Sequence, residues 1–378
     1  MKNYTSIFAL LFLSYFSFAQ ETIQASIIHD DIQRDYILYV PAIYDGENAV
    51  PLILNFHGYG SNATEQMFYG DFRSISDTAN FLVVHPEGTL LNNVSHWNVG
   101  GWTFGSTVDD VAFTSALIDS LSLEYNIDPE RIYATGMSNG GFMSYLLACQ
   151  LSDRIAAIAS VTGSMTPQTY DNCEPQRPMS IMHIHGTDDS VVPYLGAFFT
   201  EPVENALAYW VTFNNADQEP TLNPVEDSNT NDGSNAEHII YGNGEKGVRV
   251  EHYKIYGGDH TWPGTIFNQP GTNYDIDASL EIWKFFSLYN INGLIGNTSS
   301  TEHVSGYPKI DIFPNPAEDK IKINCDQDFP IKFEIISSNG AKVLTGIVDS
   351  RKEIDVSSLL PKLYFLKIGN NMTRFVKY

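Results

Sequence analysis

A serine flanked by glycines constrains the fold more than any other feature of the sequence. Gly136-Met-Ser138-Asn-Gly140 follows a short apolar run, 131–135, and precedes a stretch with helical spacing. A serine on such a sharp strand-to-helix turn needs neighbours without side chains two residues away on either side. In this context the pattern predicts a nucleophilic serine at Ser138; the alternative is an ordinary glycine-rich turn.

Short apolar runs alternate with amphipathic stretches on both sides of this turn. The runs that are typical of buried parallel strands lie at 51–56, 81–85, 131–135, 155–161 and 179–184. Helical spacing is found from residue 107, after residue 140, and at 203–213 and 278–289. The alternation predicts an α/β domain with a mostly parallel sheet flanked by helices. Residues 214–236, rich in Asn, Asp, Pro and Ser, are expected to form an exposed loop or loose hairpin.

The C-terminal part has a different pattern. Short runs that alternate polar and apolar residues lie at 320–324, 331–335 and 364–368, with turns such as Asn339-Gly340 between them. They predict a small all-β sandwich over 307–378. A stretch of Asn, Gly, Ser and Thr at 291–306 is typical of a linker.

The charge balance changes at the same boundary. Residues 306–378 carry 11 basic and 9 acidic side chains, whereas residues 20–305 carry 9 basic and 36 acidic ones. Because nucleic acid and anionic lipid would both be repelled by so acidic a domain, neither is expected as a partner.

The first residues indicate export. Lys2 precedes an apolar run, 7–18, which ends in Ser17-Phe18-Ala19, a small-x-small cleavage signal. We therefore predict a signal peptide over 1–19, followed by the main domain over 20–290. The run is too short to span a bilayer, which disfavours the alternative of an uncleaved anchor, and no membrane span is expected in the mature chain.

The three cysteines are too few for a disulfide-stapled scaffold. Cys149 and Cys173 either form a disulfide or stay as two buried thiols. His183-x-His185, close to two aspartates, has a spacing that a metal could use, but a serine mechanism already accounts for that loop. No metal and no cofactor are therefore expected.

A serine nucleophile needs a base and an acid, which follow it along the chain in the order Ser, Asp/Glu, His. Four histidines satisfy this order: His238, His252, His260 and His303. The first two fall in predicted strands and the last in the linker, whereas His260 lies in a glycine-rich loop after an apolar run. We predict His260 as the base. The acid is expected directly after 179–184, where the sequence offers Asp188 and Asp189.

The same chemistry needs backbone donors for the oxyanion. One is expected to be the N–H of Asn139, next to the nucleophile, and the other the N–H of Tyr59 in His57-Gly-Tyr-Gly60. Candidate substrate contacts are His57 and three tryptophans near these motifs, Trp97, Trp102 and Trp262.

Together these motifs resemble a known family. Gly136-Met-Ser138-Asn-Gly-Gly, His185-Gly-Thr-Asp-Asp189 and Gly258-Asp-His260-Thr-Trp-Pro-Gly resemble the polyhydroxybutyrate depolymerase / feruloyl esterase family of α/β-hydrolases over about residues 30–290. The resemblance implies an α/β-hydrolase fold and favours Asp189 as the acid, with Asp188 as the fallback. The chain departs from the family in lacking extra cysteines near residues 215 and 243.

The family's activity gives the expected function. The resemblance implies a serine esterase that acts on feruloyl or acetyl esters of plant polysaccharide, or on polyhydroxyalkanoate esters. Two alternatives are a serine peptidase of the same fold and a catalytically silent surface protein that binds polysaccharide.

The C-terminal part resembles a second family. Ile312-Phe-Pro-Asn-Pro-Ala, the segment 354–360 and Leu363-Tyr-Phe-Leu-Lys-Ile resemble the sorting domain of the Bacteroidetes type IX secretion pathway, although Leu363 stands where a glycine is usual. This resemblance implies that the Sec and type IX machineries deliver the chain outside the cell or to its surface. The alternative is a carbohydrate-binding or spacer sandwich.

Overall fold

The computed structural model describes residues 20–296 and, with short gaps, residues 311–377. The predicted signal peptide, 1–19, and most of the predicted linker, 297–306, lie outside the described residues. The chain divides near residue 298 into two compact units, which are described separately.

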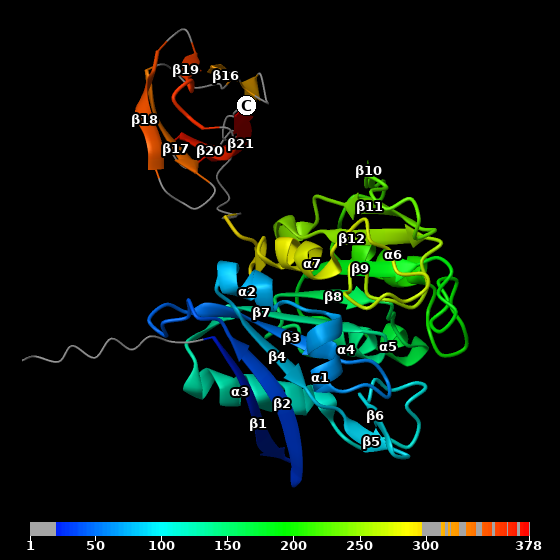
Figure 1. Ribbon diagram of the computed structural model, residues 1–378. Helices are drawn as coiled ribbons and strands as arrows, with labels where there is room; N and C mark the ends of the chain where they lie inside the picture. The colour runs from blue at the N-terminus through cyan, green and yellow to red at the C-terminus, as the bar shows by residue number, and fades with distance from the viewer. Residues whose placement is uncertain are drawn as a thin grey trace, which may run out of the picture. The chain divides into compact units, whose positions relative to one another are not determined.

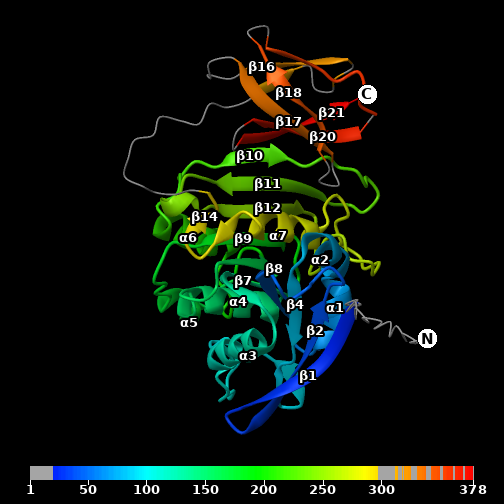
Figure 2. The same cartoon turned by 90° about the vertical axis from the view of Figure 1, so that its left-hand side faces the viewer.

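A ten-stranded sheet forms the centre of the first unit (Figure 1). Its strands, in order across the sheet, are β1 (Glu21–His29), β2 (Ile32–Val40), β4 (Leu82–Pro86), β3 (Val50–Phe56), β7 (Ile127–Met137), β8 (Ala157–Val161), β9 (Ser180–Gly186), β12 (Val250–Tyr256), β11 (Asn235–Tyr241) and β10 (Thr221–Pro224). The six strands from β4 to β12 are parallel, and the outer strands at both edges are antiparallel. Figure 2 shows β7, β8, β9, β12 and β11 following one another across the sheet.

Helices cover both faces of this sheet because alternate strand residues point to opposite sides. In β3, Leu52 and Leu54 join one hydrophobic cluster while Ile53 joins the other. The first face carries α3 (Asp110–Glu124), α4 (Asn139–Gln150), α5 (Pro167–Asp171) and α6 (Val203–Phe213); the second carries α1 (Ala63–Tyr69), α2 (Arg73–Ala79) and α7 (Ala278–Phe286). The predicted α/β fold with a mostly parallel, helix-flanked sheet is confirmed.

Two local features refine the sequence expectations. The helix expected from residue 107 begins at Asp110, because the Asp109 carboxylate caps it by accepting the Ala112 N–H at 2.8 Å. Within 214–236, strand β10 pairs antiparallel with β11, so this segment forms the outer strand and turn of a hairpin. Two short ladders, β5 (Thr89–Leu91) with β6 (Val94–His96) and β13 (Tyr289–Asn290) with β14 (Gly293–Leu294), complete the unit.

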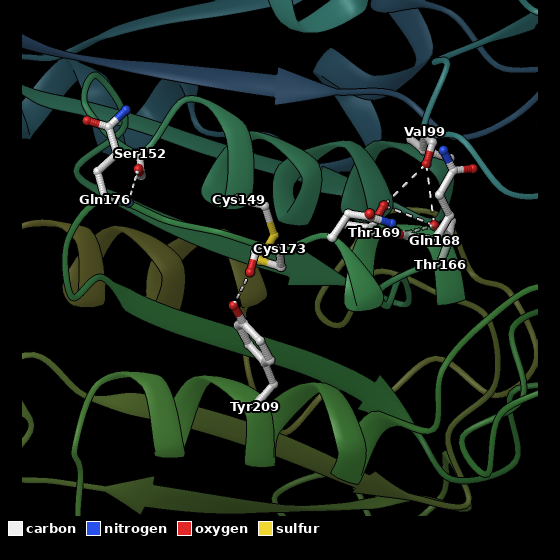
Figure 3. The surroundings of a disulfide bond; sticks show 10 residues. Val99, Cys149, Ser152, Thr166, Gln168, Thr169, Cys173, Gln176 and Tyr209 are labelled. Atoms are coloured by element: carbon white, nitrogen blue, oxygen red, sulfur yellow. Dashed lines mark hydrogen bonds between the residues drawn. A yellow bond between two sulfur atoms is a disulfide. The ribbon is translucent and has the colours of Figure 1, made fainter.

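A disulfide joins Cys149 in α4 to Cys173, which follows α5 (Figure 3). The Tyr209 hydroxyl of α6 donates a hydrogen bond to the Cys173 carbonyl at 2.6 Å. The structure thus decides between the two states that the sequence left open for these cysteines, and it ties three helical segments of one face together.

The second unit consists of two small antiparallel sheets. One contains β15 (Asp311–Phe313), β16 (Lys320–Asn324) and β19 (Glu353–Asp355); the other contains β18 (Lys342–Val348), β17 (Ile331–Ser337), β20 (Lys362–Ile368) and β21 (Asn371–Lys377). Alternate residues of β17, among them Phe333 and Ile335, enter a shared core with Ile321 and Leu366. The predicted all-β architecture of this part is confirmed.

Across the described helices, none is both long enough and apolar enough to cross a membrane.

Candidate active site

The glycine-flanked serine lies on a strained turn between β7 and α4. Ser138 has φ 53° and ψ −118°, a backbone conformation that residues with side chains adopt only at a cost of about 1–3 kcal/mol. A side chain at Gly136 or at Gly140 would collide with the carbonyl oxygen of Phe56. The close approach of β3 to this turn therefore explains both glycines, and it leaves the serine projecting from the carboxyl end of the sheet.

Asp189 and His260 come together from two neighbouring loops. Asp189 follows β9 and His260 follows β12, and the His260 Nδ1 lies 2.8 Å from the Asp189 Oδ2. The other carboxylate oxygen of Asp189 accepts the backbone N–H groups of Val191 and Val192 at 2.9 and 2.8 Å. The neighbouring Asp188 is exposed, and its carboxylate accepts the Thr187 hydroxyl instead. Of the two aspartates, the structure therefore brings Asp189 to the histidine.

The surroundings of Asp189 keep it ionised. Burial alone would raise the pKa of this carboxyl, but hydrogen bonds from His185 and His260 outweigh burial and hold the pKa well below its usual range. An ionised carboxylate can fix the ring orientation of His260 and stabilise that ring when it gains a proton.

A second aspartate ties the two loops together. The Asp259 carboxylate accepts the backbone N–H of His260 at 2.8 Å and that of Ser190 at 3.0 Å. These hydrogen bonds, the one from Ser190 first, lower the pKa of Asp259 despite its partial burial. Sequence reasoning missed this residue, although an acidic side chain directly before the expected base was a usable signal.

Ser138 and His260 line one cavity of about 480 Å³, here called the His260-side cavity. Its other lining residues include Ser61, Glu65, Phe68, Tyr69, Phe267 and Gln269. A second cavity of about 290 Å³, the Trp102-side cavity, also reaches Ser138 and is walled by Tyr59, Trp102, Phe142, Val191, Val192, Phe198 and Phe199. The serine therefore lies where a mixed polar cavity meets an almost wholly apolar one.

Backbone donors lie next to the serine. Asn139 begins α4, where the first N–H groups have no acceptor within the helix. Its side chain points elsewhere, since it pairs with the backbone of Trp97 through bonds of 2.7 and 3.1 Å. Gly58 lies beside the serine as well, because a Cβ added there would be 3.5 Å from the Ser138 Cβ. The 57–60 segment and the start of α4 thus flank the serine together.

His57 corrects one sequence expectation. It was expected to contact substrate, but it has no exposed surface. Its Nε2 accepts the Gly88 N–H at 2.9 Å, so the ring proton is on Nδ1, which lies 2.7 Å from the Gly58 carbonyl oxygen. Burial lowers the pKa of His57 to about 4 and keeps the ring neutral. Because the C=O and N–H of a trans peptide point in opposite directions, this hydrogen bond sets the direction of the Tyr59 N–H.

Two of the three candidate tryptophans are also corrected. Trp97 and Trp262 are fully buried, because their rings pack in the core and their indole N–H groups donate to the His57 carbonyl and the Ser279 hydroxyl. Only Trp102 lines a cavity at Ser138. Sequence reasoning missed the aromatic wall at 198–199; a Phe-Phe pair on the loop after the acid was the available signal.

Within the described part of the chain, no three His, Cys, Asp or Glu side chains are grouped as a metal site would require. The His183 and His185 rings are nearly parallel, with centroids 5.2 Å apart, and they hydrogen-bond edge to edge at 3.0 Å. A separate polar cleft of about 640 Å³ beside the 98–109 loop contains none of Ser138, Asp189 and His260.

Two family models match the chain. Residues 42–221 match the family described as phospholipase/carboxylesterase, and residues 311–378 match the secretion system C-terminal sorting domain. The chain is 30% identical over 281 residues to a bifunctional acetylxylan esterase/xylanase of Neocallimastix patriciarum, which covers 72% of this chain and 37% of that protein. It is 31% identical over 238 residues to feruloyl esterase B of Piromyces equi, covering 60% of this chain and 42% of that protein. The chain thus spans about two fifths of the length of these curated relatives.

Solved structures share the fold. The acetyl xylan esterase from Aspergillus awamori superposes with a TM-score of 0.52 at 13% identity, covering 71% of this chain and 99% of that one. A thermostable esterase superposes with a TM-score of 0.50 at 15% identity, covering 71% and 63% of the two chains. At these identities the likeness concerns the fold alone.

Proposed function

We propose that the chain is an exported serine ester hydrolase, because residues 42–221 match the phospholipase/carboxylesterase family, residues 311–378 match a secretion sorting domain, and the chain is similar to feruloyl and acetylxylan esterases. The observation that carries this proposal is the convergence of three groups: Ser138 on a strained turn, His260 on the same cavity, and the buried Asp189 behind it. No cofactor is needed for the chemistry that these groups perform.

The proposed reaction has two halves. The Ser138 Oγ attacks the ester carbonyl carbon while His260 takes its proton at Nε2, since Nδ1 faces Asp189. The carbonyl oxygen becomes an oxyanion beside the N–H groups of Asn139 and Tyr59. The tetrahedral intermediate collapses, the C–O bond to the alcohol breaks, and His260 gives its proton to the leaving alcohol. Water then attacks the acyl-enzyme in the same way, and it releases the acid and restores Ser138.

The two cavities indicate which part of the ester each would hold. His260 must protonate the leaving alcohol, so the alcohol belongs in the His260-side cavity, where Ser61, Glu65 and Gln269 offer hydrogen bonds suited to a sugar. The acyl group then belongs in the Trp102-side cavity, whose walls are aromatic and aliphatic. A wall of this size and chemistry supports an aromatic acyl group such as feruloyl over acetyl. The polyhydroxyalkanoate ester and the peptide stay as the other predicted substrates.

The first test is Ser138→Ala. We expect it to abolish hydrolysis of p-nitrophenyl acetate while the circular dichroism spectrum and the thermal unfolding midpoint stay close to those of the wild type. A fluorophosphonate probe should label the wild type at Ser138 and leave the variant unlabelled. Activity retained in Ser138→Ala would contradict the mechanism, and an unlabelled wild type would favour the silent polysaccharide-binding alternative.

The second test concerns the acyl group. Among methyl ferulate, acetylated xylan, hydroxybutyrate oligomers and a peptide, we expect the highest kcat/KM for methyl ferulate. Trp102→Ala should lower kcat/KM for methyl ferulate by about tenfold or more while changing that for p-nitrophenyl acetate much less, because a small acyl group does not reach the wall. Phe104→Ala is a matched control, since Phe104 is exposed and lies outside both cavities. Equal losses on both substrates would contradict the assignment.

The sorting domain supports a proposed destination outside the cell or on its surface. Deletion of residues 311–378 should leave esterase activity inside the cell envelope, whereas the full chain should deliver it to the medium or the cell surface. Equal export of both forms would favour the spacer or carbohydrate-binding alternative.

A further inference from the structure

Buried side chains form a line of short polar contacts from Tyr145 in α4 to Asp189, the proposed catalytic acid. The Tyr145 hydroxyl lies 2.7 Å from the His183 Nδ1, and the His183 Nε2 lies 3.0 Å from the His185 Nδ1. The His185 Nε2 then lies 2.8 Å from the Val192 carbonyl oxygen and 3.2 Å from the Asp189 Oδ2. The tyrosine and both histidines have no exposed surface, and none of them lines either cavity at the serine.

Hydrogen-bond chemistry gives this line one direction. The Val192 carbonyl can only accept, so the His185 Nε2 carries a proton. Among the described residues the Tyr145 hydroxyl has one hydrogen-bond partner, the His183 Nδ1, and it donates to that nitrogen. A neutral His183 then carries its proton on Nε2 and donates it to the His185 Nδ1. Burial lowers the pKa of His183 well below its usual value and raises the pKa of Tyr145, so both groups hold the protons that this order assigns to them.

We propose that Tyr145, His183 and His185 are positioning residues that hold the Asp189 carboxylate in place for His260. This inference rests on the proposed serine hydrolase function. The first carboxylate oxygen of Asp189 is held by two backbone N–H groups, whereas the second receives only the His185 and His260 rings among the described residues. His185 therefore fixes the oxygen that the proposed base uses, and the two residues behind it fix the His185 ring.

Other ionisable groups pack around this line without reaching Asp189. His252 lies between the His183 carbonyl and the Tyr194 hydroxyl, at 2.9 Å from each, and burial lowers its pKa to about 4. The Tyr194 hydroxyl donates to Glu204 at 2.7 Å, and Glu204 also meets Lys254 at 3.4 Å.

On the side of the base loop, Asp259 binds backbone N–H groups. A change in the pH dependence of the reaction that follows substitution of His185 would therefore come from the Asp189–His260 pair.

The decisive variant is His185→Phe, which keeps a flat ring but removes the donor. We expect kcat for p-nitrophenyl acetate to fall about 10- to 100-fold with KM within about twofold, because the acid and base lose their alignment. In this variant the Asp189 carboxylate has one hydrogen-bond donor fewer, so it stabilises the protonated His260 ring more strongly. Because the base must be unprotonated to act, the acidic limb of the kcat/KM profile should move to higher pH.

Two further variants separate positioning from simple support of the fold. The amide of His185→Gln can place an N–H close to the original Nε2, so this variant should recover most of kcat and the wild-type pH limb. Tyr194→Phe is the matched control: it disturbs the same buried cluster, away from Asp189, and should lower the unfolding midpoint without moving kcat or the limb. Loss of kcat in His185→Phe with no shift of the limb and no rescue by glutamine would overturn the proposal.

If His185→Phe does not fold, the wild type decides the question. Nitrogen-15 NMR of labelled histidines should find a proton on the Nε2 of both His183 and His185 and should find the His185 Nδ1 acting as an acceptor. A proton on the His185 Nδ1 would overturn the proposal. A wild-type rate in Asp189→Asn would overturn the proposed triad instead, so the two failures are distinguishable.

Discussion

Ion pairs chosen from the two units of the chain differ in burial. In the first unit, residues 20–296, which we propose to be a hydrolase and here call the hydrolase unit, the Arg34–Asp110 pair is 2.6 Å apart with side chains 2% and 0% exposed. The Asp189 carboxylate that meets His260 in this unit is fully buried. In the sorting domain, Glu353 pairs with Lys320 and Lys322 at 3.6 and 3.4 Å across β16 and β19, and all three side chains are one third exposed or more. We therefore expect the removal of one partner to lower the free energy of unfolding much more for a buried pair than for an exposed pair.

The buried Arg34–Asp110 pair connects the sheet to the loop that carries Trp102. One oxygen of Asp110 accepts from Arg34 of β2, and the other accepts the Asn98 backbone N–H at 2.7 Å. The Arg34 guanidinium also lies over the Phe113 ring, 3.7 Å from its centroid. The pair thus fixes the start of α3 to the sheet and to the loop that carries Trp102.

The largest effect is expected at Asp189. Asp189→Asn should lower kcat for p-nitrophenyl acetate by about 10⁴-fold, because an amide cannot hold His260 in the tautomer that accepts a proton from serine. Asp188→Asn is the matched control, since the exposed Asp188 carboxylate accepts a hydrogen bond from the Thr187 hydroxyl and does not meet His260, and its kcat should stay within about twofold. A large loss in the control and a small one at Asp189 would show that the adjacent carboxylate is the acid.

The next effect concerns folding. Arg34→Met leaves the Asp110 charge buried without its partner, and we expect the free energy of unfolding to fall by about 3–5 kcal/mol. Urea unfolding followed by tryptophan fluorescence measures this for the hydrolase unit, because all five tryptophans lie before residue 284. A loss below about 1 kcal/mol would mean that this pair behaves like the exposed ones.

Acidification should also distinguish the two units. Burial lowers the pKa of His85 to about 3, whereas an unfolded histidine titrates near about 6.5. The unfolded state therefore binds more protons between these values, and stability is present above about pH 6.5 and is lost as the pH falls. From pH 7 to pH 5 this histidine alone costs the hydrolase unit about 2 kcal/mol. Residues 311–378 contain no histidine, so the sorting domain escapes this effect.

The variant His85→Leu tests the acid sensitivity directly. Neither ring nitrogen of His85 has a hydrogen-bond partner among the described residues, so leucine removes the titrating group without breaking a bond. The difference in urea midpoint between pH 7 and pH 5 should be smaller in the variant than in the wild type. An unchanged difference would assign the acid sensitivity to the other buried histidines, His57 and His252, whose pKa values burial lowers to about 4.

Much of the fold could be predicted because its signals are local. Apolar runs of strand length, the alternation in 331–335 and the glycines around Ser138 each report a steric or burial requirement within a few residues. The choice between Asp188 and Asp189 could not be made from spacing, because adjacent side chains leave the loop in different directions. It needed the geometry in which Val191 and Val192 donate to one of the two.

The roles of His57, Trp97 and Trp262 could not be predicted for a different physical reason. Each lies within a few residues of a site motif, and the sequence does not show on which side of the backbone its ring packs. The structure turns all three rings into the core, where they support the loops that carry the site. The line from Tyr145 to His185 was hidden in the same way, because it joins a helix to a strand 38 residues further along the chain.

The smallest change in the free energy of unfolding is expected for the exposed ion pairs of the sorting domain. This change tests most directly whether burial separates the two kinds of pair. Glu353→Gln removes the charge opposite Lys320 and Lys322, but water already screens all three groups, and the free energy of unfolding of this domain should change by less than about 0.5 kcal/mol. Amide hydrogen exchange of β16 and β19 in the full chain measures that change locally. Ile321→Ala, which empties a fully buried position of β16 between Lys320 and Lys322, is the positive control and should cost about 2–5 kcal/mol. A cost above about 1 kcal/mol for Glu353→Gln would mean that exposure alone does not separate the two kinds of pair.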